Sequence, residues 1–162
     1  HRGSTCHCGQ RGCLEMYASE QFILGEIDRL RRLGIPMALD QHGEVSIDSI
    51  YEAARTDDTI QGILTRQGEN LGVGLKNMVN LLNPAAIILG GEGLRGGDFL
   101  LRGVRETIQT NFFAKHQRQL EFHTCNLGED VFLIGACSLV VEELFRAPIY
   151  RERTELELAR QQ

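Results

Sequence analysis

The sequence has no tryptophan, few aromatic residues (6%) and no apolar run long enough to cross a membrane. Its longest nearly apolar stretch, residues 131–141, falls well short of the roughly 20 residues that span a bilayer. We therefore expect neither a membrane segment nor a signal peptide. With 162 residues, 42% of them hydrophobic and 24% charged, the chain has the size and composition of one globular domain.

Basic residues are also scarce, with 17 Lys and Arg against 22 Asp and Glu and a formal net charge of -5. Proteins bind nucleic-acid phosphates through clustered Lys and Arg. Only Arg29, Arg31 and Arg32 form a locally basic stretch, which we interpret as the solvated face of a helix. We therefore do not expect these residues to bind DNA or RNA.

The five cysteines are an odd number and are unevenly placed. Cys6, Cys8 and Cys13 crowd one short loop, whereas Cys125 and Cys137 stand singly among apolar residues. This distribution indicates a reducing, cytoplasmic compartment and a metal site.

Three thiolates so close in sequence can converge on one tetrahedral ion, because the intervening glycines let the backbone turn tightly. Zinc prefers such soft ligands, with one further ligand that is usually a histidine. The alternative is a disulfide with one cysteine left over, and geometry disfavours a bond between Cys6 and Cys8.

Hydrophobic periodicity predicts a helix-rich α/β chain. The predicted helices begin with a turn or two at 14–18 and continue at 19–33, 46–54, 58–82, 98–112 and 130–145, and the predicted strands cover 85–89 and 120–125. Ser46 is expected to cap the helix that follows it, and Asp58 and Gln61 to form a capping box for the next. The order of strands and helices implies a right-handed crossover and a parallel pair, with strand 85–89 buried on both faces.

The long helix contains Gly68, Gly72 and Gly74. Each interior glycine costs a helix about 1 kcal/mol, so we expect a neighbouring backbone to approach closely here. Two strands are too few to cover helices this apolar. We infer that the chain is a fragment, completed by strands from earlier in the native polypeptide or from a partner chain. We also expect self-association through the glycine face or the final helix.

The loop sequence Cys6-His7-Cys8-Gly9-Gln10-Arg11-Gly12-Cys13-Leu14-Glu15, followed by Tyr17-Ala18-Ser19, resembles the signature of the ROK family of repressors, open reading frames and sugar kinases. The resemblance continues through residues 79–84, which end in Asn83-Pro84, and through a strand that ends in Gly90-Gly91. It also includes residues 127–130 and 135–136, so it covers the chain to about Phe145.

The resemblance implies an actin-like ATPase fold, which is ribonuclease H-like, with two lobes. This chain would be the later part of the second lobe. Residues 1–145 would then be the C-terminal part of a sugar-binding and oligomerisation domain, with a zinc loop at 1–13. Residues 146–162 would form a charged C-terminal tail.

In the family the cysteine loop binds a structural zinc ion, an upstream histidine is the fourth ligand, and the glutamate of the motif contacts sugar hydroxyls. These roles carry over to Cys6, Cys8, Cys13 and Glu15. His1 lies closer to Cys6 than the family's histidine does. Either the loop is shorter here and His1 serves at the zinc and beside the sugar, or that histidine is missing from this chain.

Two of these residues also have simpler explanations. His7 is a less favoured zinc ligand, because in an extended Cys-x-Cys segment its side chain points away from those of its neighbours. Glu15 alone would be explained as a carboxylate stabilised at a helix start.

The turn at Gly90-Gly91-Glu92-Gly93 would correspond to the one that faces the nucleotide in the kinases of the family. Glycine turns after buried strands often cradle phosphates with backbone N–H groups. Here Glu92 brings a negative charge and no lysine stands nearby, so a plain tight turn is the alternative.

Two functions follow from the resemblance. The favoured one is the sugar-sensing, oligomerising part of a transcriptional repressor. Such a protein would bind a sugar or sugar phosphate, form a homodimer or tetramer, and reach operator DNA only through an N-terminal domain absent from this chain. The other is the second half of a sugar kinase that uses ATP and Mg²⁺. The catalytic Asp and first phosphate loop would then lie outside this chain, so the chain alone would not be an enzyme. A stand-alone zinc module is a third reading, and glucose, N-acetylglucosamine and xylose are not separable.

Overall fold

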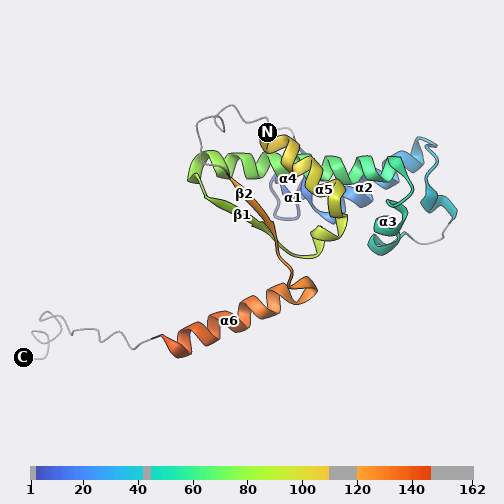
Figure 1. The fold of residues 1–162 in the computed structure, drawn as a ribbon. Coiled ribbons are helices and arrows are strands. Elements are labelled where there is room, and N and C mark those ends of the chain that lie inside the picture. The colour runs from blue at the N-terminus through green and yellow to red at the C-terminus, as the bar shows by residue number, and fades with distance from the viewer. Residues whose placement is uncertain (1–2, 42–44, 110–119, 147–162) are drawn as a thin grey trace, which may run out of the picture.

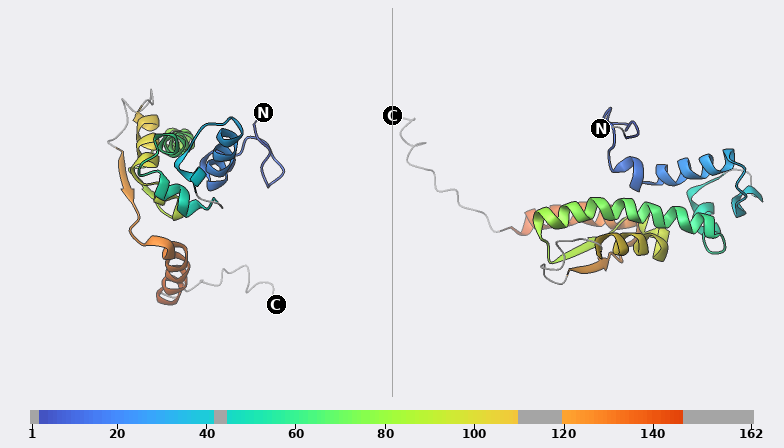
Figure 2. Two further views of the ribbon diagram at one scale, coloured as in Figure 1. Left: turned by 90° about the vertical axis from the view of Figure 1, so that its right-hand side faces the viewer. Right: turned by 90° about the horizontal axis from the view of Figure 1, so that it is seen from above.

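One long central helix packs against several of the shorter helices. The computed structural model describes residues 3–41, 45–109 and 120–146. In chain order the α-helices, 3-10 helices (η) and strands are α1 (Glu15–Ala18), α2 (Glu20–Arg32), η1 (Ala38–Gln41), α3 (Ile47–Ala53), α4 (Asp58–Leu82), β1 (Ala86–Leu89), η2 (Glu92–Gly96), α5 (Gly97–Gln109), β2 (Glu121–Thr124), η4 (Gly128–Asp130) and α6 (Val131–Phe145). Helix α4 runs along the molecule with α2 and α5 beside it (Figures 1 and 2).

The predicted helices and strands are all present, with local differences at their ends. Ser46 caps α3, as predicted, and the structure adds a capping box with Ser49. The predicted box of Asp58 and Gln61 is wrong: the cap of α4 is Asp57, whose carboxylate accepts the N–H groups of Thr59 (2.8 Å) and Ile60 (3.2 Å). Helix α5 is described as far as Gln109, and the end predicted at Phe112 lies outside the described residues, as do residues 147–162 of the predicted tail 146–162.

Helix α4 ends at the predicted place. The following residue, Asn83, has a left-handed φ of 45° and donates its N–H to the Val79 carbonyl at 2.9 Å. Pro84 comes next and prevents the helix from continuing.

The glycines of α4 allow α5 to approach closely, as predicted. A Cβ atom on Gly68 would lie 2.1 Å from the Leu100 carbonyl oxygen, and one on Gly103 of α5 would lie 2.1 Å from the Thr65 carbonyl oxygen. Gly74 instead faces the Leu14 side chain. The glycine face proposed for self-association is therefore occupied from within the chain.

Alanine at either contact should destabilise the fold. Because the clashing atoms are backbone, we expect Gly68→Ala or Gly103→Ala to lower the free energy of unfolding by about 1–3 kcal/mol or more. A Cβ atom on Gly62 of α4 would meet nothing within 4 Å beyond the backbone of its own helix, so Gly62→Ala should instead stabilise the helix by about 1 kcal/mol. Urea unfolding of the three variants would measure both effects. Equal stability of Gly68→Ala and Gly62→Ala would contradict this packing.

Two apolar clusters form the core. The first joins α2, α3 and the N-terminal half of α4, and includes Ile23, Ile50, Ile60 and Leu64. The second lies between α5 and the sheet and is centred on Leu100, Val104 and Ile108.

Strands β1 and β2 form the predicted parallel pair, in a register from Ala86 opposite Glu121 to Leu89 opposite Thr124. The prediction that β1 is buried on both faces is wrong for the described residues. Ile87 and Leu89 pack into the cluster under α5, whereas Ile88 is 71% exposed on the other face. The reason is that α5 covers only one face of this two-stranded sheet.

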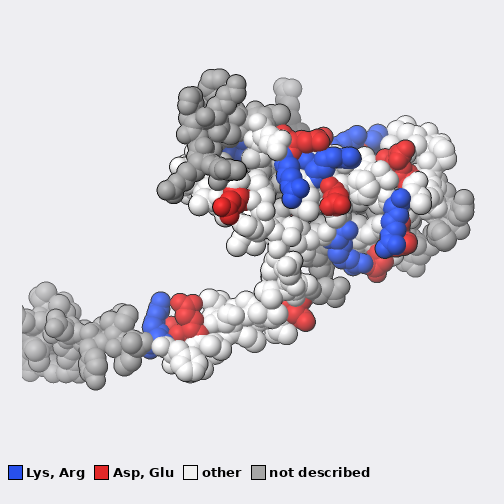
Figure 3. Space-filling view, in the orientation of Figure 1, with Lys and Arg blue, Asp and Glu red and all other residues white. Residues whose placement is uncertain are grey.

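Helix α6 extends away from the other helices (Figures 1 and 2). None of its residues is buried, and Phe132, Leu139 and Leu144 are at least 70% exposed. Figure 3 shows α6 as a nearly uncharged surface with charges near its ends, whereas both signs of charge are interspersed over the rest of the visible face. Among the described residues no helix combines the length and apolar character that a membrane crossing requires.

Candidate functional site

The cysteine loop folds back on itself as a tight hairpin. Thr5 and Arg11 form an antiparallel bridge, and the N–H of Gly12 donates to the Ser4 carbonyl at 2.9 Å. Gly9 and Gly12 have φ values of 83° and 76°, which residues with a Cβ rarely adopt. These two glycines therefore allow the reversal that brings the cysteines together.

The three thiols of this loop converge, as predicted. The Sγ atoms of Cys6, Cys8 and Cys13 all lie within 4.8 Å of one another, and those of Cys8 and Cys13 are 3.5 Å apart. Zinc–sulfur bonds of about 2.3 Å in a tetrahedron would separate sulfurs by about 3.8 Å, so the cluster fits such an ion after small adjustments. All five cysteines are free, so the structure does not adopt the alternative of a disulfide.

The thiols influence one another's protonation. The hydrogen bond between the backbone of Gln10 and Cys8, followed by those from Cys13 and Cys6, lowers the pKa of Cys8. The pKa of Cys13 is raised to about 11, first because Cys13 shares a hydrogen bond with Cys8 and then because of Cys6. A cation held by the three sulfurs would favour the thiolate form of each, as in a thiolate metal site.

The predicted cluster has three ligands, Cys6, Cys8 and Cys13, among the described residues. His1 lies outside them, so its predicted roles at the zinc and the sugar remain predictions. The Nε2 atom of His7 lies 2.7 Å from the Gln21 side-chain oxygen on α2. This contact occupies Nε2 and leaves Nδ1 of the ring, so the lower preference for His7 as a ligand stays a prediction.

Glu15 is the first residue of α1, directly after the cysteine loop. Its side chain is exposed and lies in the first helical turn, where a negative charge is stabilised. The Glu15 carboxylate is therefore available for hydrogen bonds from outside the chain.

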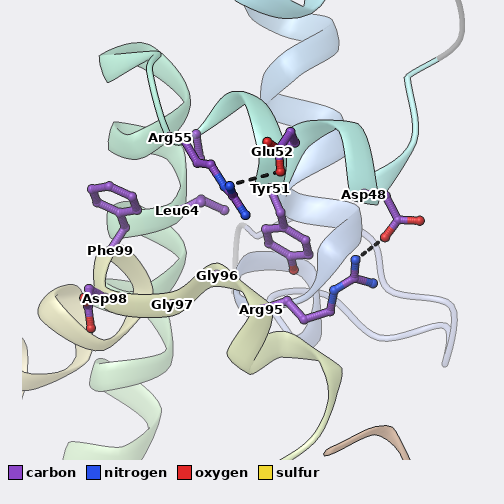
Figure 4. Close-up of a pocket in the computed structure, with 11 residues that line it drawn as sticks. Asp48, Tyr51, Glu52, Arg55, Leu64, Arg95, Gly96, Gly97, Asp98 and Phe99 are labelled. Carbon is purple, nitrogen blue, oxygen red and sulfur yellow. Dashed lines mark hydrogen bonds and ion pairs between the residues drawn. The ribbon is translucent and has the colours of Figure 1, made fainter.

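A pocket of about 470 Å³ lies elsewhere, between α3 and the start of α5, and none of the predicted site residues lines it. In Figure 4 the Arg95 side chain reaches past the Tyr51 ring, with its guanidinium 5.4 Å from the ring centroid, and pairs with Asp48. Arg55 pairs with Glu52 at 3.3 Å. Each arginine of the pocket is thus paired with a carboxylate of α3, Asp48 or Glu52.

The Gly90-Gly91 turn lies at the carboxyl end of β1, and Gly91 has a φ of 94°. It leads into the short helix η2, and not directly into α5. A Cβ on Gly91 would lie 3.5 Å from the Phe132 ring, so the start of α6 packs against the turn. The side chain of Glu92 lies outside the described part of the chain.

Sequence reasoning missed the polar contacts that hold α1. Gln67 and Asn70 of α4 donate their side-chain amides to the carbonyls of Ala18 (3.0 Å) and Tyr17 (2.9 Å). A glutamine within the apolar stripe of α4, between Leu64 and Leu71, was the only signal in the sequence.

The helix-rich α/β fold matches ROK-family sugar kinases and regulators among solved structures. A ROK glucokinase from Streptomyces griseus, solved with glucose and AMPPNP, matches with a TM-score of 0.65 and 25% identity, over 85% of this chain and 47% of that one. The sequence model of the ROK family matches residues 1–143. The chain belongs to the ROK family.

Curated relatives include both branches of the family. A xylose repressor from Caldicellulosiruptor bescii is 27% identical over 150 residues, which are 90% of this chain and 38% of the repressor. A glucokinase from Halalkalibacterium halodurans is also 27% identical, over 87% of this chain and 44% of the kinase. The chain therefore spans less than half the length of these relatives, and identity does not separate the two branches.

Proposed function

We propose that this chain is the sugar-sensing part of a ROK transcriptional repressor, with one structural zinc ion and Glu15 as a sugar ligand. One observation supports the zinc ion and the sugar ligand above the others: three cysteine sulfurs converge, and the exposed Glu15 follows the last of these cysteines by two residues. A carboxylate accepts hydroxyl hydrogen bonds strongly, and one anchored beside a rigid loop holds its direction.

Within this proposal Cys6, Cys8 and Cys13 hold the zinc ion, and His1 is the candidate for the fourth position. When bound, zinc supplies a cross-link that orders the loop, and it takes no part in a reaction. Glu15 orients the sugar, because its carboxylate accepts hydrogen bonds from the sugar hydroxyl groups.

We also propose that residues 1–145 form the later part of the second lobe of the actin-like fold. The open face of the β1–β2 sheet and the uncovered α6 support this, because both leave apolar surface for another part of the protein. Residues earlier in the native polypeptide, or a second copy in a homodimer or tetramer, would provide the cover.

The kinase is the second candidate, and the equal identity to a glucokinase supports it. Two features favour the repressor. The Gly90-Gly91 turn packs against Phe132 and does not open an α-helix whose N–H groups could face a phosphate. The sequence also places Glu92 in that turn.

Assays of DNA binding and ATP consumption on the full-length protein distinguish the repressor from the kinase. With xylose, glucose or N-acetylglucosamine at saturation, we expect release from operator DNA in a fluorescence anisotropy titration and no ATP consumption. Sustained ADP formation that depends on one of these sugars, without an effect on DNA binding, would contradict the repressor and favour the kinase.

A further inference from the structure

Helix α1 is too short to hold itself in place. It has four residues, none of them buried, although it carries Glu15 and follows the cysteine loop. Helices this short are unstable in water without contacts from elsewhere. The direction of Glu15 therefore depends on what fixes α1 to the rest of the molecule.

Two side-chain amides of α4 provide that contact. Gln67 donates to the Ala18 carbonyl at 3.0 Å, and Asn70 donates to the Tyr17 carbonyl at 2.9 Å. These are successive carbonyls at the C-terminal end of α1, where a helix leaves its C=O groups without partners. Helix α4 thus caps α1 from the side.

The connection continues from α1 into the cysteine loop. The Tyr17 hydroxyl accepts the backbone N–H of Ser4 at 2.8 Å, and the Ser4 carbonyl accepts the N–H of Gly12 at 2.9 Å. Gly12 immediately precedes Cys13. A chain of hydrogen bonds therefore runs from α4 through Tyr17 to the base of the loop.

Burial of Gln67 is hard to explain by stability alone. The residue is only 1% exposed, and its side-chain oxygen has no hydrogen-bond partner among the described residues. A buried polar atom without a partner is unfavourable, and an apolar side chain of the same shape can be neutral or better. What an apolar side chain could not supply is the hydrogen bond to Ala18.

We propose that Gln67 and Asn70 are positioning residues for the zinc loop and for Glu15. They fix the C-terminal end of α1, and Tyr17 transmits that restraint to the loop. This inference rests on the proposed function of the loop, and its test separates the two.

Gln67→Met removes the hydrogen bond and keeps the shape of the side chain, and Asn70→Leu does the same one turn further on. Gln61 provides a matched control, because it also lies on α4 and donates its amide to a carbonyl at a helix end, that of Ala54 at 2.9 Å. Gln61→Met therefore removes the same kind of bond from α3 instead of α1.

Hydrogen exchange over residues 3–18 and the rate of zinc release to a chelator are measured on each variant, together with its melting temperature. Loss of one hydrogen bond should make both processes about two- to tenfold faster in Gln67→Met. Gln61→Met should leave the exchange over residues 3–18 and the rate of zinc release unchanged. This should hold even if it changes the melting temperature as much as Gln67→Met does, or more.

Equal behaviour of Gln67→Met and Gln61→Met in the exchange of residues 3–18 would overturn the inference. If the parent chain binds no zinc, the proposed zinc site fails, and the exchange comparison still decides whether Gln67 positions α1.

Discussion

Replacing Cys8 by serine should abolish zinc binding. A serine hydroxyl stays protonated near neutral pH and is a poor ligand for this ion, so Cys8→Ser leaves two thiolates where three converge. The zinc content should fall from about one ion per chain to almost none, and the affinity by more than the roughly 10- to 100-fold that outer-shell changes cost. Elemental analysis of protein purified without a metal-affinity tag measures the content.

Cys137→Ser is the matched control, since Cys137 is a free, exposed cysteine of α6 far along the chain from the loop. It should leave the zinc content unchanged. A folded parent chain with no metal and three titratable thiols in the loop would contradict the site itself.

Replacing Glu15 by glutamine should weaken sugar binding by about ten- to hundredfold, because it removes a charged acceptor of hydroxyl hydrogen bonds. The fold should survive, since the side chain is exposed. In a repressor the variant would stay on its operator when the sugar is added; in a kinase it would mainly raise the KM for the sugar. Isothermal titration calorimetry on the full-length protein measures the affinity.

Glu20→Gln controls for loss of a helix-start charge, because Glu20 is the first residue of α2 as Glu15 is of α1. Its sugar affinity should equal that of the parent. If Glu15→Gln binds every sugar as tightly as the parent does, Glu15 is only a carboxylate at a helix start.

The convergence of the cysteines could be predicted because it is local. Cys6, Cys8 and Cys13 lie in one hairpin, and Gly9 and Gly12 allow the backbone reversal that brings the thiols together. Helix ends were predictable for the same reason, as at Ser46 and Asn83.

The sequence predictions were wrong or incomplete where contacts between residues far apart in the sequence determine the structure. Asp57 is the cap of α4, and its carboxylate also accepts the N–H of Ala38 at 2.7 Å, a contact that no local pattern contains. The hydrogen bond from Gln67 to Ala18 joins residues 49 positions apart. The burial of β1 was overestimated because its apolar run does not reveal which of its faces the chain itself covers.

Sugar titration of the full-length protein before and after zinc removal tests most directly whether the zinc loop supports the sugar site. Calorimetry with xylose, glucose and N-acetylglucosamine is carried out on the zinc-loaded protein and on protein stripped by a chelator, with circular dichroism to confirm that the stripped protein stays folded. We predict that at least one sugar binds the loaded protein, and that its affinity falls by at least about tenfold on stripping and recovers when zinc is restored. Unchanged sugar affinity in a folded, zinc-free protein would contradict the coupling of the cysteine loop to Glu15.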